Sequence, residues 1–211
     1  MNILFQDEHI VVCVKKRGVL SQGDAAGREN MVDLLKNECG CEIYPVHRLD
    51  REVGGIMVYA KNQKAAAELS KQVSERTADK SYLAVIHGSC DKEKGTMEDL
   101  LFFDKSKNKS FTVKKERRGV KKALLEYECI GKTEEKTLVR VKLHTGRTHQ
   151  IRVQFASRKM PLYGDRRYGA KDSESTIALW SYLIGFTHPE TKERMSFEFL
   201  PEGDSGFRDF Y

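Results

Sequence analysis

The chain has 211 residues, of which 39% are hydrophobic and 32% charged, a balance typical of a soluble globular protein rather than a disordered chain or a membrane protein. No apolar run approaches the roughly 20 residues that a membrane-spanning helix needs, and Asp7 and Glu8 are acidic where a signal peptide would be basic. We therefore expect one cytoplasmic domain over residues 1–211, whose net charge of +6 suits a polyanionic partner.

The first half of the chain alternates short apolar strands with amphipathic helices. Residues 10–15 are β-rich and predict a strand, and after a glycine-containing loop residues 29–39 carry apolar positions at helical spacing. Residues 56–60 predict another short strand. Residues 61–76 place small and apolar side chains four positions apart, with charged residues between them, which predicts a helix with one buried face.

The second half of the chain favours strands joined as hairpins. A helix is predicted from Thr148 onward, where apolar residues recur at helical spacing. Strands are predicted for residues 81–87, 123–130, 138–143, 178–186 and 195–199. Because strands outnumber helices and most connections are hairpins, we expect an α+β fold, with a mostly antiparallel mixed sheet flanked by helices.

Positive charge is concentrated in residues 105–122. This segment holds nine basic residues and a single acid, so it carries a net +8 while the rest of the chain sums to −2. Such a run can be an ordinary solvated loop or a hairpin that contacts phosphates, and the pattern leaves both open. If it contacts phosphates, Lys114, Lys115, Arg117 and Arg118 are the expected contacts.

The five cysteines do not indicate a disulfide framework or a zinc site. They lie at positions 13, 39, 41, 90 and 129, an odd number without a paired Cys-x-x-Cys spacing. We expect reduced thiols that pack as small hydrophobic side chains.

Two short segments concentrate polar and charged residues beside predicted strands. Val-His-Arg-Leu-Asp at residues 46–50 precedes a Gly-Gly turn and a buried strand, where such residues are costly for a core but useful in a cleft. Thr-Gly-Arg-Thr-His-Gln-Ile-Arg at residues 145–152 lies at a strand-to-helix junction, where backbone N–H groups and the helix dipole favour anions. Between them, Lys80 and Tyr82 stand two positions apart and so share one face of a strand.

Four segments together resemble the RluA-type family of pseudouridine synthases. In chain order they are His-Arg-Leu-Asp at 47–50, Lys-Ser-Tyr-Leu-Ala at 80–84, the motif at 145–152, and Gly-Asp-Arg-Arg-Tyr-Gly at 164–169. The resemblance covers about residues 5–200 and implies the catalytic domain of that family, without the S4-like RNA-binding domain found in some members. The chain departs from the family in two turns, which have Lys-Lys-Arg-Gly at 15–18 and Val-Gly-Gly at 53–55. These departures concern loop geometry and RNA contacts rather than the carboxylate, so they bear on the choice of RNA more than on the reaction type.

The resemblance also implies roles for individual residues. Asp50 corresponds to the catalytic carboxylate, Arg147 to its ion-pair partner, and Tyr82 to the aromatic residue that stacks on the target base. The other residues expected at the RNA are Arg48, His47, Lys80, His149 and Arg152, together with Lys114, Lys115, Arg117 and Arg118. For His47 and His149 we favour structural hydrogen bonds over metal binding, because neither has a third ligand at a helical or hairpin spacing.

A carboxylate suits this reaction by either of two routes. Pseudouridine formation breaks the N1–C1′ bond of uridine, turns the uracil and rejoins it through C5. The carboxylate can attack or stabilise C1′, or it can accept the C2′ proton on a route through a glycal. The sequence leaves this choice open. In a dry pocket an arginine is the simplest partner that keeps such a carboxylate ionised, because it stays charged and offers a planar fork.

We expect a monomer that needs no metal or organic cofactor and acts on a uridine in a loop of tRNA or rRNA, since the target base must leave its stack. One competing interpretation is a non-catalytic RNA-binding domain of the same fold. Another is a metal-dependent RNA hydrolase, for which the sequence lacks a carboxylate cluster. A third is that Asp50 and Arg147 form an ordinary buried ion pair.

Overall fold

Two units make up the computed structural model, which describes residues 2–211. The first unit contains the chain up to Lys80 together with Ser181–Leu200, and the second contains Ser81–Trp180 and Pro201–Tyr211. The chain therefore leaves the first unit within one strand and returns to it within another. Whether both units act as the single domain that we expect over residues 1–211 stays a prediction.

The sheet of the first unit is built on two completely buried strands. Its strands are β1 (Asn2–Gln6), β2 (Ile10–Lys15), β3 (Tyr44–Pro45), β4 (Gly54–Ala60), most of β10 (Leu179–Thr187) and β11 (Arg194–Glu198). The strand order is β1-β2-β4-β10, with β3 paired to β4 and β11 paired to β10. Every residue of β2 and β4 is buried, which explains why both segments read as continuous apolar runs.

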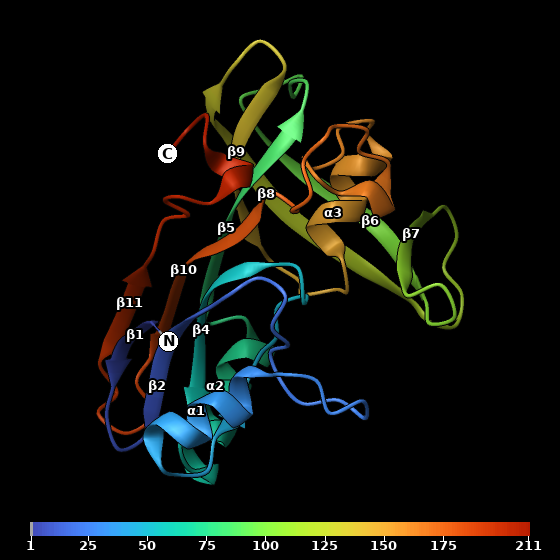
Figure 1. Ribbon diagram of the computed structural model, residues 1–211. Coiled ribbons are helices and arrows are strands. Elements are labelled where there is room, and N and C mark those ends of the chain that lie inside the picture. The colour runs from blue at the N-terminus through green and yellow to red at the C-terminus, as the bar shows by residue number, and fades with distance from the viewer. Residues whose placement is uncertain (1) are drawn as a thin grey trace. The chain divides into compact units, whose positions relative to one another are not determined.

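Two helices accompany this sheet (Figure 1). Helix α1 (Met31–Cys39) begins at Asn30, whose side chain accepts a hydrogen bond from the Asp33 N–H, and ends at Gly40 in the left-handed conformation. Helix α2 (Gln63–Glu75) begins at Asn62 in the same way. Its stripe of small and apolar residues packs on the buried side chains of β2 and β4, so this stripe is part of the core.

The second unit has its own sheet and one helix. Its strands are most of β5 (Asp79–His87), β6 (Lys94–Asp104), β7 (Lys109–Val113), β8 (Val120–Lys132) and β9 (Lys136–Leu143). Their order is β5-β9-β8-β6-β7, and each neighbouring pair is antiparallel. Helix α3 (Gln150–Ser157) lies beside β6 and β7 (Figure 1). Two short 3₁₀ helices follow, at Arg166–Tyr168 and Ser205–Phe207.

The expected α+β class is confirmed, and each predicted strand or helix is present with bounds shifted by a few residues. Strands β1, β3, β6 and β7 were not predicted. Charged and polar residues recur along β6, and β7 lies inside the basic segment, so neither has a clear alternating pattern. Within residues 2–211, every helix is too short or too polar to cross a membrane.

Candidate active site

Asp50 lies in the loop between β3 and β4, and the segment that follows β2 fixes the shape of this loop. The Ser21 hydroxyl donates to the carbonyl of Leu49 and accepts from the Leu49 N–H, both at 2.9 Å. The Val53 N–H donates to the Asp50 carbonyl at 3.0 Å and closes a turn. The Tyr59 hydroxyl of β4 donates to the Ser21 carbonyl at 2.9 Å. Asp50 is thus held by backbone and core contacts, with its side chain only partly buried.

Lys15, at the end of β2, is buried beneath the same loop. Its ammonium donates to the carbonyls of Val19 at 2.7 Å, Lys16 at 3.1 Å and Arg51 at 3.1 Å. Burial lowers the pKa of Lys15 to about 8; the charge of Arg17 adds to this shift, whereas the charges of Glu52 and Asp50 oppose it. Lys15 is therefore a cation close enough to Asp50 for their charges to interact.

His47 and Lys80 lie close together in the first unit. The His47 Nε2 accepts a hydrogen bond from the Val58 N–H at 3.2 Å, which puts the ring proton on Nδ1. Burial lowers the pKa of His47 well below its usual value, and the charge of Lys80 lowers it further. His47 is therefore neutral and supports β4. The expected structural hydrogen bond of His47 is present, and a contact between His47 and RNA stays a prediction.

Arg147 lies in the loop that joins β9 to α3 in the second unit. Its Nε donates to the Lys122 carbonyl at 2.9 Å, and its backbone N–H donates to Gln150 Oε1 at 3.0 Å. Gln150 is buried and also accepts from the Thr145 hydroxyl at 2.8 Å, while its own Nε2 donates to the Leu124 carbonyl at 3.1 Å. The loop is thus fastened to β8, and it occupies the strand-to-helix junction that the sequence predicts.

His149 precedes α3 in the left-handed conformation, with φ of 55°. Its Nδ1 lies 3.0 Å from the Tyr168 hydroxyl, which also accepts from the Ser110 N–H of β7 at 2.8 Å. The Ser110 hydroxyl in turn donates to the Thr148 carbonyl at 2.5 Å. His149 therefore makes a structural hydrogen bond, as expected, within a network that joins β7 to the Arg147 loop.

Arg152 requires a revision, because its surroundings do not fit the expected contact with RNA. Its side chain is 5% exposed and forms a two-pronged ion pair with Asp165, with Nε to Oδ2 at 2.6 Å and Nη2 to Oδ1 at 2.8 Å. The guanidinium also lies 5.1 Å from the centroid of the Tyr168 ring. We therefore interpret Arg152 as a residue that holds the turn at 164–169 against α3.

The remaining expected site residues of the second unit are Tyr82 and four residues of the basic segment. Tyr82 is 7% exposed on β5, opposite Val141 of β9. The expected phosphate contacts Lys114, Lys115, Arg117 and Arg118 are all exposed, in the connection between β7 and β8. This position agrees with either of the two interpretations of the segment.

The expected residues are thus divided between the units. His47, Arg48, Asp50 and Lys80 belong to the first unit, whereas Tyr82 and Arg147 belong to the second. Three residues that position the motifs were not predicted: Lys15, Ser21 and Gln150. Only Gln150 lies inside a motif, and the other two act on residues that are distant in the sequence.

Residues 2–211 contain no cluster of three His, Cys, Asp or Glu side chains that could hold a metal ion. The expectation that the reaction needs no metal stays a prediction.

A comparison with known protein families identifies the class of reaction. The model of the RNA pseudouridylate synthase family matches residues 9–157, a range that contains Asp50, Tyr82 and Arg147. The chain belongs to this family. It is therefore an isomerase of the class that modifies RNA, and the resemblance to the RluA-type synthases is confirmed.

Individual relatives agree with this assignment. An RNA pseudouridine synthase of Aquifex aeolicus (strain VF5), itself uncharacterized, is 38% identical over 94% of this chain and 68% of the relative. The dual-specificity RNA pseudouridine synthase RluA of Vibrio parahaemolyticus serotype O3:K6 (strain RIMD 2210633) is 30% identical over 100% of this chain and 88% of the relative. The structure of human RNA Pseudouridylate Synthase Domain Containing 4 superimposes with a TM-score of 0.78 over 94% of this chain and 88% of that chain; at 21% identity it supports the fold alone.

Proposed function

We propose that this chain converts specific uridines in loops of tRNA or rRNA to pseudouridine, with Asp50 as the catalytic carboxylate and without a metal or organic cofactor. The observation that carries the proposal is the Asp50 loop, whose backbone is fixed by Ser21 and by the buried ammonium of Lys15. A reactive group must be held in place by its surroundings before it can act on a substrate.

In the proposed reaction the Asp50 carboxylate acts on the ribose of the target uridine. It either stabilises positive charge at C1′ as the N1–C1′ bond breaks, or accepts the C2′ proton. The detached uracil must stay in the site to be rejoined through C5, so water has to be kept out.

We assign Arg147 the role of ion-pair partner of Asp50. A guanidinium keeps its charge in a water-poor site and presents two parallel N–H groups to a carboxylate. The hydrogen bond from Nε to the Lys122 carbonyl would fix one edge of the group, which supports a positioned partner rather than a mobile surface arginine.

Tyr82 is proposed to stack on the target base and to replace part of the stacking that the base loses when it leaves the RNA helix. Arg48, which is exposed, and the four basic residues between β7 and β8 are proposed to contact the RNA backbone. The Vibrio relative is named as dual-specificity, which supports keeping more than one substrate class in the proposal.

A map of pseudouridine across total RNA tests this proposal. Three strains are compared: one with the intact gene, one without it, and one that expresses Asp50→Asn at the same level. We expect at least one specific pseudouridine to be absent from both altered strains, and purified Asp50→Asn to bind the RNA nearly as well as the unmodified protein. An unchanged map in the strain without the gene would instead support the non-catalytic RNA-binding domain.

A further inference from the structure

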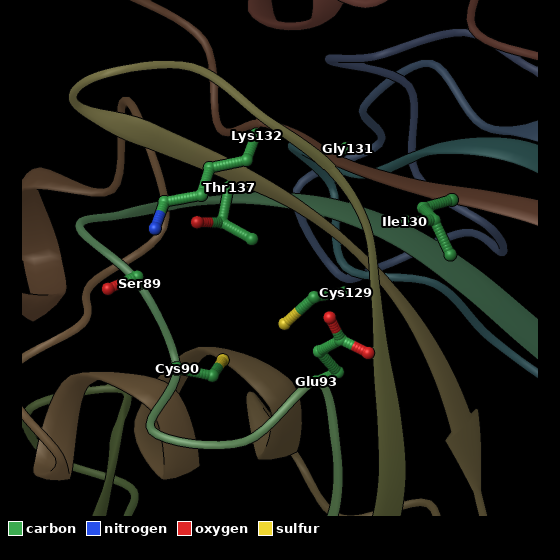
Figure 2. A pocket seen from close by; sticks show the side chains of 8 residues that line it. All are labelled: Ser89, Cys90, Glu93, Cys129, Ile130, Gly131, Lys132 and Thr137. Atoms are coloured by element: carbon green, nitrogen blue, oxygen red, sulfur yellow. The ribbon is translucent and has the colours of Figure 1, made fainter.

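A cavity in the second unit brings two cysteines together. It has a volume of about 320 Å³ and lies where the connection from β5 to β6 passes the hairpin of β8 and β9. Figure 2 shows the side chains of Cys90 and Cys129 on neighbouring walls of this cavity, with both sulfur atoms turned toward its interior. The two residues are far apart in the sequence, and the fold alone makes them neighbours.

The two cysteines are close enough to influence each other. Both Cys129 and the Tyr127 hydroxyl lie near enough to the Cys90 thiol to shift its pKa. The Cys129 Sγ lies 3.8 Å from the carbonyl of Lys92. Neither cysteine is fully buried and both line the cavity, so a small reagent that enters the cavity meets both residues.

The Cys90 thiol is held in its protonated form. Burial raises the pKa of Cys90 to about 12, and the neighbouring Cys129 adds to this shift while Tyr127 opposes it. Cys90 is therefore a poor first nucleophile near neutral pH, which leaves the first attack to Cys129.

The segment that carries Cys90 has few contacts that would prevent a small movement. Between Gly88 and Glu93, Cys90 is the only residue that is not exposed, and Gly88 has a φ of 70°. On the other side, β8 is irregular between Cys129 and Gly131, where its register with β9 shifts. A loop with little buried surface beside a bulged strand can adjust to the geometry of a covalent bond.

We propose that Cys90 and Cys129 are a thiol–disulfide exchange site, which forms an intramolecular disulfide by reaction with a low-molecular-weight disulfide. The Cys129 thiolate attacks one sulfur of the reagent and releases the first thiolate, leaving a mixed disulfide on Cys129. The Cys90 sulfur then attacks Cys129 Sγ, forms the Cys90–Cys129 disulfide and releases the second thiolate. The protein loses two protons and two electrons, and the reagent becomes two thiols. This site is independent of the proposed role of Asp50.

Peptide mapping of the unmodified protein tests the proposal without any variant. The reduced full-length chain is incubated with 2-hydroxyethyl disulfide, remaining thiols are alkylated, and the protein is digested with trypsin without reduction. We expect residues 81–92 to be linked to residues 123–132, each of which contains one cysteine, and the link to disappear with dithiothreitol. If residues 81–92 and 123–132 are recovered only as separate alkylated peptides, the proposal is wrong.

Single variants test the order of attack. Cys90→Ser should stop the reaction at a mixed disulfide on Cys129. In Cys129→Ser, Cys90 should react several times more slowly than Cys129 does in Cys90→Ser, because burial, the largest cause of the raised pKa of Cys90, remains. As a matched control, Cys39→Ser/Cys41→Ser removes the other close pair and should leave the linkage unchanged. Equal reaction rates in the two single variants would overturn the assignment of Cys129 as the attacking thiol.

Discussion

The ammonium of Lys15 donates hydrogen bonds to three backbone carbonyls, and one of them belongs to Arg51, the neighbour of Asp50 in the chain. Because burial lowers the pKa of Lys15 to about 8, the contribution of this ammonium to stability depends on pH. Burial also lowers the pKa of Lys80 to about 8.

Lys15→Met should make the free energy of unfolding rise less between pH 7.5 and 9.5 than it does in the unmodified protein. The folded pKa of Lys15 is about 8 and the usual value is 10.5, so between these pH values the unfolded state binds more protons. Folding is penalised below pH 8, and the free energy of unfolding rises as the pH increases toward 10.5. Urea unfolding at pH 7.5 and 9.5 measures the rise. An equal rise in Lys15→Met and in the unmodified protein would contradict this assignment.

The Arg152–Asp165 pair predicts strong coupling between two substitutions. Because the side chains are 5% and 1% exposed, Arg152→Met or Asp165→Leu alone leaves one buried charge, at a cost of about 3–5 kcal/mol. The double variant removes both charges and should cost less than the sum of the single variants. Denaturant unfolding of all four proteins gives the coupling energy, and additive costs would show that the pair is not coupled in this way.

Individual residues show which positions the sequence alone can single out and which it cannot. Asp50, Tyr82 and Arg147 could be singled out because they stand in motifs that resemble a family. Lys15 and Ser21 could not, because the partners through which they hold the Asp50 loop, Arg51 and Leu49, lie about thirty positions away and are reached only in the folded chain. The motif marks Arg152 as a charged residue, but the buried carboxylate of Asp165 that neutralises it appears only in the structure.

At the level of elements, the start of β4 depends on a glycine. Gly55 has a φ of 121°, and a Cβ at this position would lie 2.2 Å from the Ser181 carbonyl oxygen of β10. The Gly-Gly that follows the Asp50 loop therefore allows two strands to pair closely.

Gly55→Ala should destabilise the protein by about 3 kcal/mol or more, because the backbone of β10 must move. Gly18→Ala is the matched control: Gly18 has a φ of 83° and a Cβ added there would meet no atom within 4 Å, so only backbone strain of about 1 kcal/mol is expected. Thermal unfolding measures the loss of stability in each variant. Similar losses of stability in the two variants would exclude close packing as the cause.

The connection between β7 and β8 makes a prediction about RNA affinity. If Lys114, Lys115, Arg117 and Arg118 contact phosphates, changing all four to Gln should reduce the slope of log affinity against log salt by roughly 0.7 for each phosphate that is no longer neutralised. Lys64→Gln/Lys71→Gln on exposed positions of α2 is the control and should leave the slope unchanged. Filter binding at several salt concentrations measures this slope for each variant. An unchanged slope in the four-residue variant would make the segment a solvated loop.

Among the elements, those with a clear periodicity were predictable. Strands β2 and β4 are buried along their whole length and therefore have continuous apolar runs, whereas α2 buries one face and therefore has an apolar stripe. Strand β6 alternates poorly, because its residues are exposed, half-buried and buried in an irregular order. Its strand character comes from pairing with β7 and β8, which are distant contacts that no local pattern contains.

For the whole molecule, the α+β class could be predicted but the two units could not. Boundaries between units usually fall in exposed linkers rich in proline or glycine. The third crossing of this chain, between Leu200 and Pro201, has such a proline, but the other two lie within strands: in β5 between Lys80 and Ser81, and in β10 between Trp180 and Ser181. Because strands continue across both points, the sequence contains no linker signal at either of them.

The division of the chain also separates the proposed catalytic residues, with Asp50 in one unit and Tyr82 and Arg147 in the other. The family match spans all three positions. Their common action on one uridine is the central proposal, and the carboxylate of Asp50 is the group on which it depends.

The most direct test is the single-turnover rate of pseudouridine formation by purified Asp50→Asn, on RNA isolated from cells that lack the gene. The amide cannot serve as a base or as an anionic stabiliser, so we predict a rate lower by at least about 10²–10⁴-fold, with an RNA dissociation constant within about threefold of that of the unmodified protein. A rate for Asp50→Asn within tenfold of the unmodified protein, at matched RNA occupancy, would show that another group performs the chemistry.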